Sequence, residues 1–276
     1  EDVDAFASRA LAAGASEIFP VADHFYGDRA GRLADPFGHI WIVATHKRDV
    51  SEEEMRRLLE ESSEPQESDL APRTAYVVEP YIAVSGAARL IDFAKQAFDA
   101  EVMSRHTRAD GSVQHAKLRI GDAVIGAGDP QEGPGSPTAL HLYVPDVEVA
   151  YERALRAGAK STYRPTDQDY GDREAAVKDP FGNHWYIATQ RTEGRKTAPH
   201  VPEGLRSVTS YLHPHGASRL IDFLKDAFEA KEVFRAQTPD GTVAHAKIRI
   251  GESVVEMGEA HGPYQPMPTG YHLYVD

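Results

Sequence analysis

A short polar motif, Tyr-Gly-Asp-Arg, occurs in two distant parts of the chain and joins a phenol, a carboxylate and a guanidinium within a few residues. In each copy it precedes a predicted pair of short strands. The aspartate and the arginine could pair and hold a loop, or the motif could form the polar rim of a ligand pocket. Both interpretations apply to the residues of the two copies: Tyr26, Asp28 and Arg29, and Tyr170, Asp172 and Arg173.

A second pair of polar positions lies in the strings HAKLRI and HAKIRI, which contain His115 and His245. Side chains alternate between the two faces of a strand, so His115 shares its face with Lys117 and Arg119. A face with three polar groups is typical of a solvated surface, and it would also suit a water-filled ligand cavity. The two histidines are therefore candidates for ligand binding.

Composition limits the function classes. The 276 residues carry a net charge of −13 and include no cysteine, which excludes disulfides, thiolate metal sites and cysteine nucleophiles. The negative charge opposes binding to nucleic acids and anionic membranes and favours cationic ligands, although an acidic surface also serves solubility. The chain starts with acidic residues where a signal peptide would be basic. We expect a cytoplasmic protein with a small-molecule partner and neither a nucleic-acid nor a membrane partner.

The elements that position these motifs come from an internal repeat. Segment 1–46 aligns with 145–190 without a gap, and both contain RALxAGA, YGDR and DPFG. Segment 75–128 aligns with 205–258 in the same way and shares RLIDF, HAK and RIG. The chain therefore alternates between two types of unit.

Both types of unit have the same predicted order of elements. In the segment 75–128, a strand near 81–84 precedes a helix over 87–98, in which apolar residues recur at helical spacing. Turns at Asp110-Gly111 and Gly121-Asp122 then separate short strands. In the other type, a strand at 141–144 precedes a helix over 147–157 that Gly158 ends, and three strands follow. The pattern predicts an α+β fold of tandem βαβββ units that must pair to bury their sheets.

The two ends of the sequence complete one such unit. The final string YHLYVD matches the strand LHLYVP, and the initial EDVDAF matches the helix that follows that strand. This pattern predicts a circular permutation with the termini side by side. The predicted modules are 75–190, and 205–276 plus 1–46, with linkers at 47–74 and 191–204. The alternative is a fragment of a longer array whose end strand pairs with another molecule, as in an end-swapped dimer.

Taken together, the twofold βαβββ repeat, PYIAVSGAARLIDFAKQAF, HLYV before DVxxA, and YGDR followed by DPFGNHWYIAT resemble the glyoxalase/bleomycin-resistance/extradiol-dioxygenase (vicinal oxygen chelate) superfamily. The DPFG string followed by W-x-x-AT resembles its PhnB-like branch. The resemblance implies paired vicinal-oxygen-chelate modules that curve around cavities, which hold a divalent ion in metal-bearing members.

The same resemblance implies metal-ligand positions on the first and last strands of each unit. His141, His272 and Glu256 match the residue types expected there. The closing strands hold Tyr186 and Ile42 where metalloenzymes of the family keep a glutamate. The remaining positions are held by Glu79, Thr209 and Gly126. No combination gives a full ligand set, and the histidines could equally be core residues. If Glu256 is buried, its carboxylate requires a partner.

Two functions remain open. The first is a metal-free binder of a small molecule, such as a cationic or aromatic drug, which needs no cofactor. The second is a divalent-metal-dependent lyase, isomerase or transferase with ligands drawn from Glu256, His141 and His272, in which the metal acts as a Lewis acid. The absence of a full ligand set favours the binder. In either case we expect a monomer that behaves as an internal pseudo-dimer. Trp41 and Trp185 are predicted to be core residues, and DPFG a turn.

Overall fold

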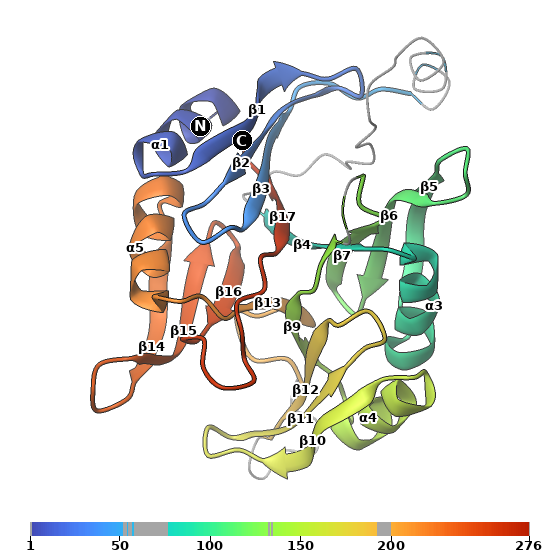
Figure 1. The fold of residues 1–276 in the computed structure, drawn as a ribbon, viewed down its shortest axis with the longest axis vertical. Helices are drawn as coiled ribbons and strands as arrows, with labels where there is room; N and C mark the ends of the chain where they lie inside the picture. Colours follow the sequence, from blue (N-terminus) through green and yellow to red (C-terminus); the bar gives the residue numbers. More distant parts are fainter. Residues whose placement is uncertain are drawn as a thin grey trace. The chain divides into compact units, whose positions relative to one another are not determined.

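The computed structural model describes residues 2–51, 54, 57, 77–131, 133, 135–191 and 200–275. The chain divides into two compact units (Figure 1). Unit 1 comprises residues 1–79, 213–253 and 257–276, and unit 2 comprises residues 80–212 and 254–256. The predicted linkers 47–74 and 191–204 lie in large part outside the described residues, and the predicted module boundaries stay a prediction.

Unit 2 contains one repeat unit of each type. We call the type of segment 75–128 the first type and the type of segment 145–190 the second type. The first-type repeat unit consists of most of β4 (Val77–Val84), α3 (Ala87–Phe98), β5 (Glu101–Thr107), β6 (Val113–Ile120) and β7 (Ala123–Gly128). The short strand β8 (Gly135–Ser136) follows. The second-type unit consists of β9 (Ala139–Tyr143), α4 (Val147–Arg156), β10 (Lys160–Asp167), β11 (Asp172–Lys178) and β12 (His184–Gln190). Strand β13 (Val208–Leu212) completes this part of the chain.

Unit 1 contains most of the other two repeat units. In one of them, α5 (Ala217–Phe228), β14 (Lys231–Gln237), β15 (Val243–Ile250) and the ends of β16 (Ser253–Met257) belong to unit 1. Its first strand, β13, and residues Val254–Glu256 belong to unit 2. The other consists of β17 (Gly270–Tyr274), α1 (Val3–Ala12), β1 (Ser16–Asp23), β2 (Asp28–Ala34) and β3 (Ile40–His46). The α+β fold of tandem βαβββ units with two sheets, predicted from the repeat, is confirmed.

Strand pairing shows how the units combine. In unit 2, the strands run in the orders β4-β7-β6-β5 and β10-β11-β12-β9-β13. Strand β9 pairs in parallel with β12, and its other edge pairs antiparallel with β13, the first strand of the next repeat unit. The sheet formed by segment 139–190 therefore continues into β13. In unit 1, the order β1-β2-β3-β17 joins the first strands of the sequence to the last one.

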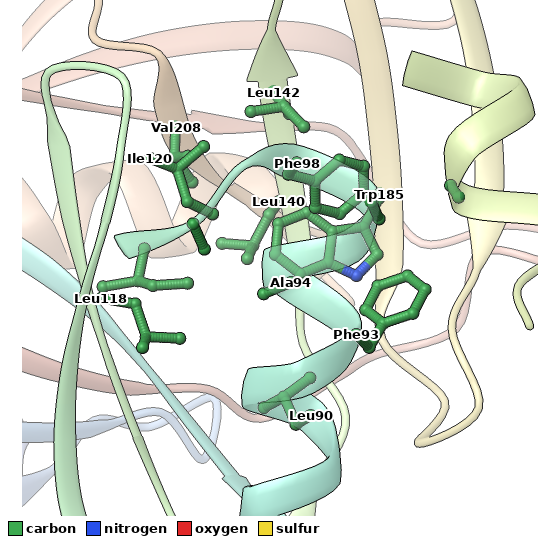
Figure 2. Close-up of a cluster of buried hydrophobic side chains, with 14 of the residues drawn as sticks. Leu90, Phe93, Ala94, Phe98, Leu118, Ile120, Leu140, Leu142, Trp185 and Val208 are labelled. Carbon is green, nitrogen blue, oxygen red and sulfur yellow. The ribbon is translucent and has the colours of Figure 1, made fainter. Parts of the chain in front are cut away.

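Helices α3 and α4 cover the core of unit 2 (Figure 2). The helix α3 is amphipathic because its apolar residues recur every three or four positions, and Leu90, Phe93 and Ala94 are all buried. Trp185 from β12 is fully buried with its ring centroid 4.7 Å from that of Phe98. The prediction that Trp185 packs in the core against a helix is confirmed.

None of the helices in the described ranges has the length and apolar character needed to cross a membrane.

The DPFG turn holds this tryptophan in place. The Asp179 carboxylate accepts hydrogen bonds from the backbone of Phe181 and Asn183 at 2.8 and 2.9 Å, and from Trp185 Nε1 at 3.1 Å. In unit 1, Asp35 accepts from Trp41 Nε1 at 3.0 Å in the same way. The repeated motif is a turn, as predicted, and it also satisfies the buried indole N–H.

The two ends of the chain lie side by side in unit 1 (Figure 1). The backbone N–H of Val3 donates to Thr45 Oγ1 at 3.0 Å, and that of Val275 donates to Ala44 O at 2.8 Å. In unit 2, Val144 N donates to Ala188 O at 2.8 Å at the equivalent place. The predicted proximity of the termini is confirmed, and the circular permutation stays a prediction.

Candidate functional site around His141

The imidazole of His141 lies between two buried carboxylates in unit 2. Its Nδ1 is 2.6 Å from Glu256 Oε2, and its Nε2 is 3.2 Å from Glu174 Oε2. The exposed fractions of the three side chains are 6% for His141, 0% for Glu256 and 9% for Glu174. We call His141, Glu174 and Glu256 the acidic cluster.

The strand register shows which side chains share a sheet face with His141. His141 on β9 lies directly opposite Tyr186 on β12 and Thr209 on β13. Residues opposite each other in neighbouring strands point to the same face of a sheet. The sequence-derived positions His141, Tyr186 and Thr209 therefore share one face. Glu174, on β11, is the member of the cluster that the sequence analysis did not identify.

The carboxylates of the acidic cluster change the pKa of its histidine. Burial by itself would lower the pKa of His141, but the attraction of Glu256 and Glu174 and its hydrogen bonds to them raise it to about 10. Burial opposes ionisation of Glu174, yet its interactions with His141 and with tyrosine hydroxyls lower its pKa below the usual range. The raised pKa of His141 keeps its ring protonated at neutral pH beside the carboxylate of Glu174. Asp172 is also buried in the same unit.

Tyrosines surround the acidic cluster. The rings of His141 and Tyr143 lie 4.4 Å apart, and Tyr143 donates its hydroxyl to Asp172 Oδ2 at 3.0 Å. Tyr163 donates its hydroxyl to Glu174. Burial, followed by the charges of Glu256 and Asp172, raises the pKa of Tyr143, so this hydroxyl remains a hydrogen-bond donor. The rings of Tyr186 and Tyr211 lie 5.2 Å apart on neighbouring strands.

The arrangement does not fit the divalent ion that the family resemblance implies. A metal site needs about three ligand atoms that converge on one point. Here the two carboxylates lie at different nitrogens of one imidazole ring, and those nitrogens point in different directions. In the described ranges, no group of three or more histidine, aspartate or glutamate side chains is placed to hold a metal ion.

In both YGDR motifs, the aspartate and the arginine point in different directions and have different partners. In unit 2, Asp172 turns inward to Tyr143, whereas Arg173 pairs outward with Glu148 and Asp167. Tyr170 is 66% exposed, and burial of its hydroxyl end together with Glu174 raises its pKa. The arginine is thus bound to surface acids rather than to the aspartate of its own motif.

In unit 1, Asp28 contacts His46 Nδ1 at 2.8 Å. Arg29 pairs with Asp4 and Asp23 at 2.6 and 3.1 Å. Tyr26 is buried, with its ring 4.9 Å from that of His24. This copy of the motif therefore also points its aspartate inward and its arginine outward.

The histidines of the HAK strings lie outside the acidic cluster. His115 in unit 2 is buried, and its ring stacks on Tyr81 at 5.6 Å. Lys117 on the same face is also buried, whereas Arg119 on the same strand pairs with the exposed Glu101. His245 in unit 1 is half-buried, with its ring 5.7 Å from that of Phe234.

The equivalent of His141 in unit 1 is His272, which is buried with its Nδ1 3.5 Å from Tyr274 Oη. The sequence positions aligned with the two glutamates of the acidic cluster hold other residues. The residue aligned with Glu174 is Ala30, and the residue aligned with Glu256 is Gly126. The two glutamates of the acidic cluster are therefore not repeated at the aligned positions of the sequence.

Comparisons with known proteins agree with this fold. The model of the family Glyoxalase/Bleomycin resistance protein/Dioxygenase superfamily matches residues 73–187. An uncharacterized protein of Mycobacterium bovis is 38% identical over 120 residues, which cover 39% of this chain and 79% of that protein. An uncharacterized protein of Mycobacterium tuberculosis is also 38% identical over 120 residues, covering 71% of its length.

Two solved structures illustrate the range of similar folds. Glyoxalase I from Zea mays is 17% identical, with a TM-score of 0.47 over 72% of this chain and 68% of that chain. TioX from Micromonospora sp. ML1 is 23% identical, with a TM-score of 0.37 over 40% of this chain and 95% of that chain. The PhnB-like branch stays a prediction. On the family model and on the relatives at 38% identity, the chain belongs to the Glyoxalase/Bleomycin resistance protein/Dioxygenase superfamily.

Proposed function

We propose that this protein binds a small cationic aromatic molecule, without a metal ion, at the sheet face that carries the acidic cluster. The observation that supports the proposal is the pair of buried carboxylates, Glu174 and Glu256, that flank one imidazole ring. Buried carboxylates attract a cation strongly because little water is present to screen them.

The tyrosines add a second reason. A cation over an aromatic ring gains about 0.5–2 kcal/mol, and the gain is larger where water is excluded. Tyr143 and Tyr186 are buried close to His141, and Tyr186 packs against Tyr211. Flat aromatic ligands also stack on such rings. Aromatic rings beside carboxylates therefore favour a ligand that is both aromatic and positively charged.

Isothermal titration with N-methylquinolinium tests the proposal, with neutral quinoline as the matched probe of the same shape. We expect the cation to bind and quinoline to bind at least about tenfold more weakly, as the loss of one charge-assisted contact predicts. Glu256→Gln should weaken binding of the cation, whereas Glu252→Gln, which changes an exposed residue of the preceding turn, should leave it unchanged. Equal binding of the two probes would contradict the proposal.

The same preparation separates the binder from a metal-dependent enzyme. Protein purified without chelators and without a polyhistidine tag is measured by elemental analysis. Close to one divalent ion per chain, lost in Glu256→Gln, would overturn the metal-free proposal and would direct the search to substrates with two adjacent oxygens. Absence of a stoichiometric ion and of thermal stabilisation by added nickel, zinc, manganese or iron(II) supports the binder.

A further inference from the structure

A separate pocket lies in unit 2 beside helix α3. Its volume is about 710 Å³, within the range typical of small-molecule sites. The acidic cluster does not contribute to it. The lining residues come from the end of β4, from α3, and from the loops beside β8, α4 and β12, and those used below are Arg89, Asp92, Gln96, Pro137, Pro180 and Phe181.

Arg89 is an exposed residue of the pocket lining, and no ion pair joins it to a carboxylate in the described part of the chain. Its Cζ lies 5.7 Å from the centre of the Phe181 ring. Its Nη2 occupies space that a Cβ at residue 86 would fill, since that Cβ would come within 2.9 Å of it. Gly86, at φ 88°, is the residue that leaves this room. A guanidinium in this position can form a bidentate pair with a carboxylate that enters the pocket.

The other lining residues define the rest of a ligand. Asp92 follows Arg89 by three positions on the same helix, so the two side chains lie on one face, about one turn apart. The two charges are opposite, and both residues are exposed. Pro137, Pro180 and Phe181 supply an apolar wall beside them. The pocket thus offers a site for a carboxylate, a site for an ammonium group and a surface for an aromatic body.

The repeat in unit 1 preserves the arginine geometry. Arg219 aligns with Arg89, and its Cζ lies 5.9 Å from the ring of Phe37, which aligns with Phe181. Gly216, at φ 91°, again leaves room for the guanidinium. The arrangement of glycine, arginine and phenylalanine therefore occurs in both units.

We propose that the pocket of unit 2 binds a small zwitterion with an aromatic body, such as an aromatic α-amino acid, with its carboxylate on Arg89, its ammonium group near Asp92 and its ring against Phe181. This site is independent of the cationic-ligand site proposed above.

Three probes dissect the proposal in saturation-transfer NMR and isothermal titration: L-phenylalanine, 3-phenylpropanoate, which lacks the ammonium group, and phenethylammonium, which lacks the carboxylate. We expect L-phenylalanine to bind best and phenethylammonium worst. Arg89→Gln should weaken L-phenylalanine about tenfold or more, as loss of a charge-assisted pair predicts. Lys95→Gln, at an exposed residue of the same helix outside the pocket lining, serves as the matched control and should bind normally.

Each other outcome overturns the proposal. If L-phenylalanine shows no saturable binding, or binds Arg89→Gln as well as the parent protein, the pocket does not recognise a carboxylate. If phenethylammonium binds best and Glu256→Gln removes that binding, the probe occupies the acidic cluster, which would support the proposed function and contradict the present inference. Phe181→Leu, which keeps an apolar side chain, gives a second variant and should lower affinity for the aromatic probes.

Discussion

His141 Nδ1 lies 2.6 Å from Glu256 Oε2, although 115 residues separate the two in the chain. The contact joins β9 to β16, which belong to different units of the internal repeat. Glu174 from β11 lies at the other ring nitrogen. The buried His141 ring contacts both carboxylates, and removal of Glu256 takes away the shorter of the two ion pairs.

Replacement of Glu256 should therefore destabilise the fold. We expect Glu256→Ala to lower the free energy of unfolding by about 3–5 kcal/mol, the cost of breaking a buried ion pair. The measurement is urea unfolding followed by circular dichroism. Glu252→Ala, at an exposed position in the same hairpin, should change the free energy by no more than about 0.5 kcal/mol. Equal effects of the two substitutions would show that the pair contributes little.

The protonation of His141 gives the protein a pH dependence at alkaline pH. The pKa of His141 is raised to about 10 in the folded protein, against about 6.5 in the unfolded chain. The resulting stabilisation is complete below pH 6.5 and is lost as the pH rises through about 10. Urea unfolding at pH 6, 8 and 10 should show a progressive fall that is smaller in His141→Asn. A parallel decline in both proteins would exclude His141 as its cause.

A repeated arginine contact at the end of the longer helices should contribute modestly to stability. Arg153 Nε donates to Gln96 O at 3.1 Å, and its guanidinium pairs with Asp99 just after α3. In unit 1, Arg9 Nε donates to Ala227 O at 2.9 Å. Because Asp99 is largely exposed, we expect Arg153→Gln to lower the free energy of unfolding by about 1 kcal/mol. Thermal unfolding measures this effect, and Arg156→Gln, at an exposed arginine one turn away, is the control.

The pairing of β17 with β3 predicts the oligomeric state. Because the last strand pairs with the first unit of the same chain, we expect a 30.3 kDa monomer in size-exclusion chromatography with light scattering. A stable dimer that dissociates when residues 270–275 are deleted would indicate exchange of the end strand between molecules instead.

The sequence was sufficient to predict the fold because each repeat unit repeats its apolar periodicity, its turns and its DPFG motif. It also identified His141 and Glu256 as positions of interest. Glu174 escaped prediction because its aligned residue is Ala30, so the repeat gave no signal beyond one charged residue in the apolar string EAAV. The opposite directions of Asp172 and Arg173 could not be predicted, since each depends on partners from other elements, Tyr143 and Glu148. Which carboxylates reach a given histidine is decided by strand pairing, which composition and spacing do not determine.

The closure of unit 1 by β17 also affects how the protein folds during synthesis. The contact between Thr269 N and His39 Nδ1 spans 230 residues, and strand β3 has its parallel partner only after β17 has left the ribosome. Unit 2, by contrast, draws nearly all its residues from one continuous segment. Long-range pairing is slow because a large loop must close first. We expect unit 2 to fold while translation continues, and the edge of β3 to remain open to chaperones until the last strand arrives.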